Sequence, residues 1–148
     1  MPDRDLTLEL TDAAPPEARD AVLAPLMAFN LEQAGPPQMR PLAVLLRDEE
    51  GMIQGGLWGR TGWSWLFVEL LVVPDPHRGR GLGTALLRQA EEEALRRGCV
   101  GAWLDTFSFQ APGFYLRQGY EIVGTIRGYP PGHSRHFLRK RLVEGEDE

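Results

Sequence analysis

The sequence predicts an α/β or α+β domain, in which helices alternate with strands around one core. Two observations predict it: residues 81–98 have the pattern of a strong amphipathic helix, and apolar runs of strand length lie on both sides of it. The 148 residues suffice for one domain with a buried core, and 43% hydrophobic with 25% charged residues is typical of soluble globular proteins. We expect a single domain over residues 1–143 and a disordered acidic tail over residues 144–148.

The N-terminal segment predicts a strand followed by a helix. Residues 6–11 (LTLELT) alternate apolar with polar side chains, which indicates a short strand. Residues 12–35 begin with an aspartate and paired prolines and end at a glycine, as a helix can. Pro25 inside this stretch should kink the helix or divide it in two.

Residues 41–73 predict an antiparallel meander of three strands. The turn sequences DEEG and RTG separate the three runs. The last run, residues 65–73, is nearly all apolar, which is typical of a central strand covered on both faces.

The second half of the chain begins with the clearest helix. Within residues 81–98 one arc collects apolar side chains, and a glycine ends the segment (Leu82, Ala85, Leu86, Ala90 and Gly98). Residues 99–109 then predict a strand, residues 111–119 a short helix, and residues 120–126 and 133–143 two more strands. The whole chain therefore predicts about seven strands.

Charge and composition exclude several classes of protein. The net charge is −5, but residues 1–143 carry only −1 of it, because four negative charges lie in the tail (Glu144, Glu146, Asp147 and Glu148). No basic stripe indicates nucleic acid, and no apolar run is long enough to cross a membrane. Cys99 is the only cysteine, and His133 and His136 should face opposite sides of a strand, which is poor for a metal. We expect a cytoplasmic protein with no metal, no nucleic-acid partner and no membrane partner.

A glycine-rich turn precedes the clearest helix. Gly79, Gly81 and Gly83 alternate with larger residues in VPDPHRGRGLG. A dinucleotide fingerprint of G-x-G-x-x-G fails, because Thr84 or Leu86 stands at its last position. A phosphate loop of the G-x-x-x-x-G-K-[ST] type also fails, because no lysine follows. The alternatives that remain are a plain turn and an anion site.

The anion site has a specific physical basis. A helix start presents unpaired backbone N–H groups and the positive end of the helix dipole. Glycines let an anion approach this backbone closely, while Arg78 and Arg80 add positive charge. The segment is therefore suited to a pyrophosphate.

Two motifs resemble those of the GNAT acetyltransferase superfamily. Its acyl-CoA loop has the pattern (Q/R)-x-x-G-x-(G/A), which Arg78, Gly81 and Gly83 meet. Its later signature, N-x-x-A-x-x-x-Y-x-x-x-G-(F/Y), is met at four positions (Ala111, Tyr115, Gly119 and Tyr120), with Ser108 in place of the asparagine. The element order agrees over the whole chain except the acidic tail, and the closing sequence is similar to a bacterial subgroup of unassigned substrate.

The resemblance implies an acyl-CoA N-acyltransferase fold, with a mixed, largely antiparallel central sheet whose fourth and fifth strands splay apart. It also implies acetyl-CoA as cosubstrate, with the pyrophosphate on backbone amides of the glycine loop and the pantetheine along the end of the preceding strand. The implied cofactor-binding residues lie in these two segments and in the later motif (Leu71, Val72, Val73, Arg78, Gly79, Arg80, Gly81, Leu82, Gly83, Thr84, Ser108 and Tyr115).

The implied chemistry is direct attack of an amine on the thioester, and it requires two proton transfers. Tyr115 matches the superfamily's tyrosine that protonates the departing thiolate; otherwise it is an aromatic residue packed on the sheet. Glu69 is the first candidate for the base, because alternation places it on the face of Leu71 and Val73. Its alternative role is that of a structural partner for a backbone N–H or an arginine. Asp105, or a water chain without a dedicated base, are the other candidates.

The acceptor is a small-molecule or peptide amine, and the sequence does not choose between them. Candidate acceptor residues are Phe107 and Phe109 beside the later motif, His133 near the last strand, and Asn30 in the first helical segment. Members of the superfamily often form homodimers, so the resemblance also implies a homodimer as a possible assembly. A regulatory domain that binds acyl-CoA without chemistry and a plain interaction domain are the alternative functions.

Overall fold

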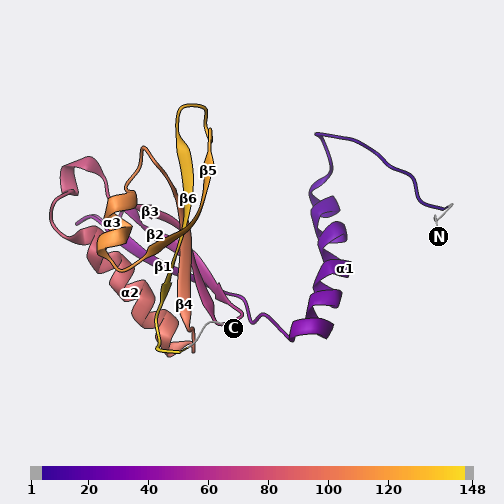
Figure 1. The fold of residues 1–148 in the computed structure, drawn as a ribbon, viewed down its shortest axis with the longest axis horizontal. Coiled ribbons are helices and arrows are strands. Elements are labelled where there is room, and N and C mark those ends of the chain that lie inside the picture. Colours follow the sequence, from indigo (N-terminus) through magenta and orange to yellow (C-terminus); the bar gives the residue numbers. More distant parts are fainter. Residues whose placement is uncertain (1–4, 146–148) are drawn as a thin grey trace. The chain divides into compact units, whose positions relative to one another are not determined.

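The computed structural model describes residues 5–145, which form two compact units, Met1–Pro36 and Pro37–Glu148 (Figure 1). The tail predicted over residues 144–148 therefore lies largely outside the described residues, and the single domain over residues 1–143 stays a prediction.

The N-terminal unit contains one helix, α1, from Pro16 to Ala34. It begins later than expected, because Pro15 occupies the N-cap position and Pro16 the first helical position, where a missing amide costs nothing. Pro25 lies inside it and does not divide it. Residues 6–11, predicted as a strand, pair with no strand in the described structure; an alternating pattern makes a strand only where a neighbouring edge accepts it.

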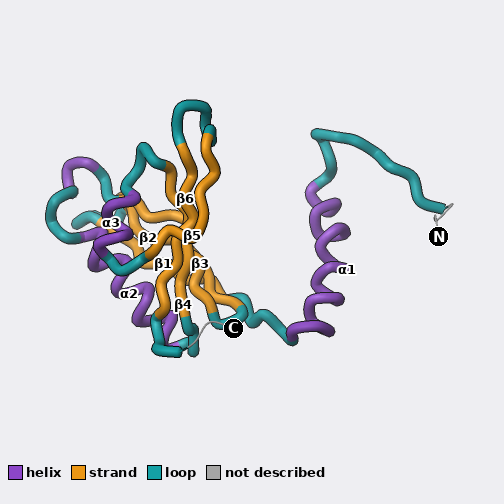
Figure 2. Tube along the Cα trace, viewed as in Figure 1, coloured by secondary structure: helices purple, strands orange, loops and turns teal. Residues whose placement is uncertain are grey.

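The second unit is built on a six-stranded sheet in the order β1-β2-β3-β4-β6-β5 (Figures 1 and 2). Neighbouring strands are antiparallel except β3 and β4, which are parallel. The predicted meander is confirmed as the first three strands, and six strands replace the expected seven. The strands span the following residues: β1 Arg40–Arg47, β2 Ile53–Gly62, β3 Trp65–Val72, β4 Gly101–Phe107, β5 Glu121–Arg127 and β6 Ser134–Arg141.

Two helices cover one face of this sheet, α2 from Leu82 to Arg96 and α3 from Pro112 to Arg117 (Figure 2). Helix α2 packs on β1, β2 and β3 through four buried side chains (Leu86, Leu87, Ala90 and Ala94). The sequence pattern predicted Leu86 and Ala90 among them. Burial of such apolar side chains supplies most of the stability of a helix in a protein. None of the helices in the described part of the chain combines the length and apolarity that a membrane span requires.

Strands β3 and β4 separate towards their C-terminal ends, as predicted. They pair only from Trp65 to Val68 on β3 and from Gly101 to Leu104 on β4. The last residues of both strands therefore lie on either side of a gap in the sheet. A short 3-10 turn, η1 (Asp75–His77), follows β3 and leads into the glycine loop.

A β-bulge in β3 interrupts the alternation of its side chains. Val68 pairs with Gly59 and Leu70 with Trp58, which leaves Glu69 without a residue opposite it on β2. Val68 is buried, whereas Leu70 is 56% exposed. Within this unit β3 is central but only one of its faces is buried, contrary to the prediction from its apolar sequence.

Candidate active site

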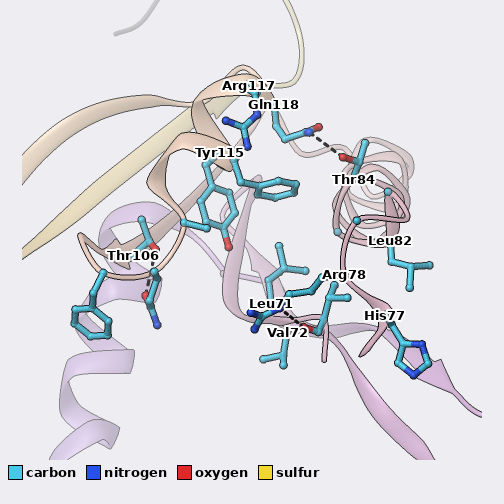
Figure 3. Close-up of a pocket in the computed structure, with 18 of the residues that line it drawn as sticks. Leu71, Val72, His77, Arg78, Leu82, Thr84, Thr106, Tyr115, Arg117 and Gln118 are labelled. Atoms are coloured by element: carbon cyan, nitrogen blue, oxygen red, sulfur yellow. Dashed lines mark hydrogen bonds between the residues drawn. The ribbon is translucent and has the colours of Figure 1, made fainter. Parts of the chain in front are cut away.

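A pocket of about 820 Å³ lies where β3 and β4 separate (Figure 3). It is lined by the end of β3 with the glycine loop, by the end of β4, and by α3. Its size falls within the range of pockets that hold a cofactor or small ligand. All its walls come from the second unit of the chain.

The glycine loop forms one wall and ends in an uncapped helix. Gly79 and Gly81 have φ angles of 82° and 74°, a left-handed conformation that other residues rarely adopt. Gly81 is the N-cap of α2, and no side chain caps the helix. The amides of the first helical turn (Leu82, Gly83 and Thr84) therefore have no carbonyl partner within the helix. A Cβ at Gly79 or Gly81 would meet no atom within 4 Å, so the space beside these residues is open.

Gly83 has a different role from the other two glycines. A Cβ at this position would lie 3.3 Å from the ring of Phe114, so the missing side chain lets α2 approach α3. A hydrogen bond of 3.0 Å from the side-chain amide of Gln118 to the hydroxyl of Thr84 holds the two helices together at the same place (Figure 3). The start of α2 is thereby fixed against α3.

Arg78 closes the loop. Its Nε donates to the carbonyl of Val73 at 2.9 Å, and its Nη1 lies 2.5 Å from a carboxylate oxygen of Asp75. Both partners of this ion pair are mostly exposed, so it adds little stability and serves to orient the side chain. Arg80 is exposed and is not a lining residue.

Tyr115 lies on α3, and its hydroxyl points into the pocket (Figure 3). The residue is only 8% exposed, and its hydroxyl forms no hydrogen bond with any residue between 5 and 145. Burial, with a smaller contribution from the charge of Asp105, raises the pKa of Tyr115 to about 12. At neutral pH this phenol is therefore a protonated donor without a partner.

Asp105 is the carboxylate of the pocket. The Nε and Nη2 atoms of Arg135 both donate to its Oδ1, at 2.8 and 2.6 Å. No residue in the described part of the chain forms a hydrogen bond with its Oδ2. The pocket thus holds a carboxylate that Arg135 fixes, that keeps one oxygen without a hydrogen bond, and whose charge contributes to the raised pKa of Tyr115.

Like Arg80, the predicted residues Glu69 and Ser108 lie away from the pocket lining. Glu69 is exposed at the bulge of β3, where the alternation that linked it to Leu71 is interrupted. Ser108 is tied to β6 instead, because its hydroxyl accepts a hydrogen bond of 3.0 Å from the amide of Ser134. Of the candidate bases, only Asp105 lines the pocket.

The predicted acceptor residues divide between the two units. Phe109 lines the pocket, Phe107 stacks on it with ring centroids 5.2 Å apart, and His133 contacts its edge at 5.0 Å. Asn30 lies on α1 in the N-terminal unit.

Sequence reasoning missed several lining residues, notably Arg117 and Gln118 (the others are His77, Thr106, Gln110 and Phe114). Helical spacing from Tyr115 could have indicated Gln118, which follows it by three residues. Gln110 gives no such signal: its side-chain oxygen accepts from the amide of Phe107 at 2.8 Å, a contact that only the folded loop shows. No group of three or more metal-binding side chains occurs among the described residues.

Known proteins resemble this chain in sequence. The model of the acetyltransferase (GNAT) family matches residues 6–120. Acetyltransferase Atu2258 from Agrobacterium fabrum is 41% identical over 133 residues, which cover 90% of this chain and 97% of that protein. Blasticidin-S acetyltransferase from Streptomyces morookaense is 45% identical over 109 residues, which cover 71% of this chain and 80% of that protein.

The fold also matches a solved structure. A crystal structure of an Agrobacterium tumefaciens protein assigned as an acetyltransferase superposes with a TM-score of 0.87 at 40% sequence identity. The match covers 92% of this chain and 99% of that one. Sequence and fold therefore point to the same family.

Proposed function

Because this chain belongs to the GNAT acetyltransferase family, an acetyl-CoA-dependent group of N-acetyltransferases, we propose that it transfers the acetyl group to the primary amine of a small molecule. The observation that carries the proposal is one pocket with three components: the open amides that begin α2, the unpartnered phenol of Tyr115 and the free oxygen of Asp105. A cosubstrate, a proton donor and an amine-binding group are what acetyl transfer requires.

The glycine loop suits the pyrophosphate of acetyl-CoA. Three amides without helical partners, the positive end of the α2 dipole and the absence of acidic residues in the first turn all favour an anion. Arg78 and Arg117 supply further positive charge from the same lining. The pantetheine arm would extend along Leu71–Val73, where β3 no longer pairs with β4 and its backbone groups are available.

Tyr115 is proposed to protonate the leaving thiolate. When the amine nitrogen bonds to the acetyl carbon, the carbon–sulfur bond breaks and the sulfur requires a proton. A phenol whose pKa is about 12 stays protonated at neutral pH, and its hydroxyl is not occupied by another acceptor. General acids in such positions contribute about 10²- to 10⁴-fold to the rate.

The amine must lose a proton before it attacks. An amine with a pKa near 10 costs about 4 kcal/mol to deprotonate at pH 7 if nothing assists. We propose Asp105 as the group that receives this proton, directly or through water, because it lines the pocket and its Oδ2 forms no hydrogen bond with the described residues. Glu69, exposed at the bulge, is the alternative base.

The acceptor is proposed to be an amine-bearing natural product or a compound of similar size. Two relatives act, by their names, on the antibiotics blasticidin S and streptothricin. Blasticidin S is the first acceptor to test, because its acetyltransferase is 45% identical to this chain.

The test is turnover of acetyl-CoA with blasticidin S. Release of the free thiol measures the rate, and mass analysis identifies the product. We expect thiol release that depends on the acceptor and is nearly abolished in Tyr115→Phe. If acetyl-CoA binds but no amine promotes thiol release, the protein is a binding domain and the proposal fails.

A further inference from the structure

Four aromatic side chains gather where β4 ends and β5 turns into β6. This aromatic cluster consists of Phe107, Phe109, Tyr129 and His133. The rings of Phe107 and Phe109 stack at 5.2 Å with an interplanar angle of 15°, and Tyr129 contacts Phe107 edge-on at 5.6 Å. The cluster joins two elements that are far apart in the sequence.

Phe109 connects the cluster to the pocket. One face of its ring lies on Phe107, and His133 touches its edge. The residue nevertheless remains 57% exposed and is a lining residue of the pocket. A large part of this aromatic residue is therefore left exposed beside the pocket, although burying it would have been favourable.

Arg135 holds the cluster and the carboxylate in one arrangement. Its guanidinium lies 5.2 Å from the ring centre of Phe107 and 5.1 Å from that of Tyr129. The same guanidinium donates to Oδ1 of Asp105 and, through Nη1, to the hydroxyl of Tyr129 at 2.9 Å. Asp105 and Phe109 are thus linked through Arg135 and Phe107.

The charges around the pocket limit the acceptor further. Asp105 is the one acidic side chain among the described lining residues, whereas His77, Arg78 and Arg117 are basic. Arg135 already occupies one oxygen of Asp105. One oxygen remains, which suffices for a single ammonium group, so any further cationic group of the acceptor should lie outside the pocket, away from its basic side chains.

We propose that the acceptor is an alkylamine that bears an uncharged flat ring, with the ring against Phe109 and the ammonium on Oδ2 of Asp105. This inference rests on the proposed function and names the substrate class of its site. Phe109 is then a specificity-determining residue, and Arg135 a positioning residue that acts through Asp105. A flat ring gains from offset or edge contact with an aromatic face, which a saturated ring of equal size does not.

The test compares three amines: 2-phenylethylamine, 2-cyclohexylethylamine and 1,5-diaminopentane. The first two share the amine and the size of the ring but differ in flatness, and the third carries two charges and no ring. Thiol release with acetyl-CoA gives kcat/KM for each amine. We expect the phenyl compound to exceed the cyclohexyl compound by about three- to tenfold, and the diamine to be the poorest.

Variants assign that preference to Phe109. In Phe109→Leu the ratio of phenyl to cyclohexyl amine should fall to about one, while Phe109→Trp should keep or raise it. Phe67→Leu is the matched control, because Phe67, like Phe109, stacks on an aromatic ring but is not a lining residue. Its ratio should equal that of the wild type.

The outcomes separate this inference from the proposed function. Equal or better turnover of the cyclohexyl amine or the diamine overturns the flat-ring acceptor and leaves the acetyltransferase intact. The same holds if acetyl-CoA raises Tm and blasticidin S is acetylated, but neither ring amine reacts. If acetyl-CoA neither binds nor turns over with any amine, the proposed function itself fails.

Discussion

The two sides of the pocket differ in what they are made of. The side assigned to acetyl-CoA consists mainly of backbone: the amides that begin α2, two glycines in left-handed conformation and the unpaired end of β3. The side assigned to the acceptor consists of side chains, namely Asp105, the aromatic cluster and the arginine that orients them.

This difference has a consequence for substitution. A site made of backbone amides requires particular backbone conformations, and the glycines and their spacing determine these conformations. A side-chain site depends on which residues the fold brings together from β4 and the β5–β6 turn. Changes on the first side should therefore affect every reaction of the enzyme, whereas changes on the second should alter the choice of amine.

Tyr115 lies between the two sides, and its loss should have the largest effect. We expect Tyr115→Phe to lower kcat by about 10³-fold, because the thiolate loses its proton donor, and to leave the KM for acetyl-CoA nearly unchanged. Steady-state kinetics with saturating amine measure this. Tyr120→Phe is the control: it removes a buried hydroxyl bonded to Glu91 at 2.8 Å and should cost stability rather than kcat.

Gly81→Val should damage the backbone side. A branched side chain at φ 74° is strained and occupies the open space beside the first amides of α2. Loss of two charge-assisted backbone hydrogen bonds should raise the KM for acetyl-CoA by about 100-fold or more. Gly98→Val places the same strain at the other end of α2, at φ 84°, and should leave that KM unchanged. An equal rise in both variants would contradict a specific anion site.

Asp105→Asn should damage the acceptor side alone. It removes the charge that holds the ammonium, so kcat/KM for the amine should fall by about 10- to 100-fold at constant KM for acetyl-CoA. Glu121→Gln also removes a carboxylate paired with an arginine, but on β5 and outside the pocket lining. Equal losses in the two variants would show that Asp105 acts through folding only.

Ser108→Ala should have no effect on either side of the pocket. The hydroxyl of Ser108 accepts from the amide of Ser134, so its loss should cost about 1 kcal/mol of stability. Thermal unfolding should therefore show a Tm lower by a few degrees. A large rise in the KM for acetyl-CoA would instead return Ser108 to the cofactor side.

The rate should not decline as the pH is raised from 7 to 10. Tyr115 donates its proton only below its pKa, which burial raises to about 12. The amine becomes reactive as pH rises towards its own pKa, so kcat/KM should increase from pH 7 to 10. No decline of kcat should occur in this range. A decline centred between pH 8 and 10 would mean that a group other than Tyr115 supplies the proton.

The conformation of the glycine loop was predictable from sequence because its requirements are local. The spacing of Gly79 and Gly81 before an amphipathic helix indicated an anion site, and the observed left-handed angles explain both residues. Gly83 was assigned to the same purpose, whereas its contact with Phe114 shows a packing role as well. The local sequence pattern does not distinguish a glycine that leaves space for an anion from one that lets two helices pack closely.

Other predictions failed where the outcome depends on a distant partner. The alternating segment 6–11 forms no strand, and a strand requires hydrogen bonds to a neighbouring strand, which a local pattern does not encode. Glu69 was placed by alternation, but a bulge, which follows from the pairing of β2 with β3, interrupts that alternation. The pairing of Arg135 with Asp105 across β6 and β4 gave no signal in the sequence at all.

The central claim is that the start of α2 holds the pyrophosphate of acetyl-CoA. Thermal unfolding with acetyl-CoA, CoA, ATP or NAD, each at about 100 times a typical dissociation constant, tests it most directly. We predict stabilisation of about 2.7 kcal/mol by acetyl-CoA and by CoA alone, present in Gly98→Val and lost in Gly81→Val. Stabilisation by ATP or NAD only, or equal stabilisation of Gly81→Val, would contradict the claim.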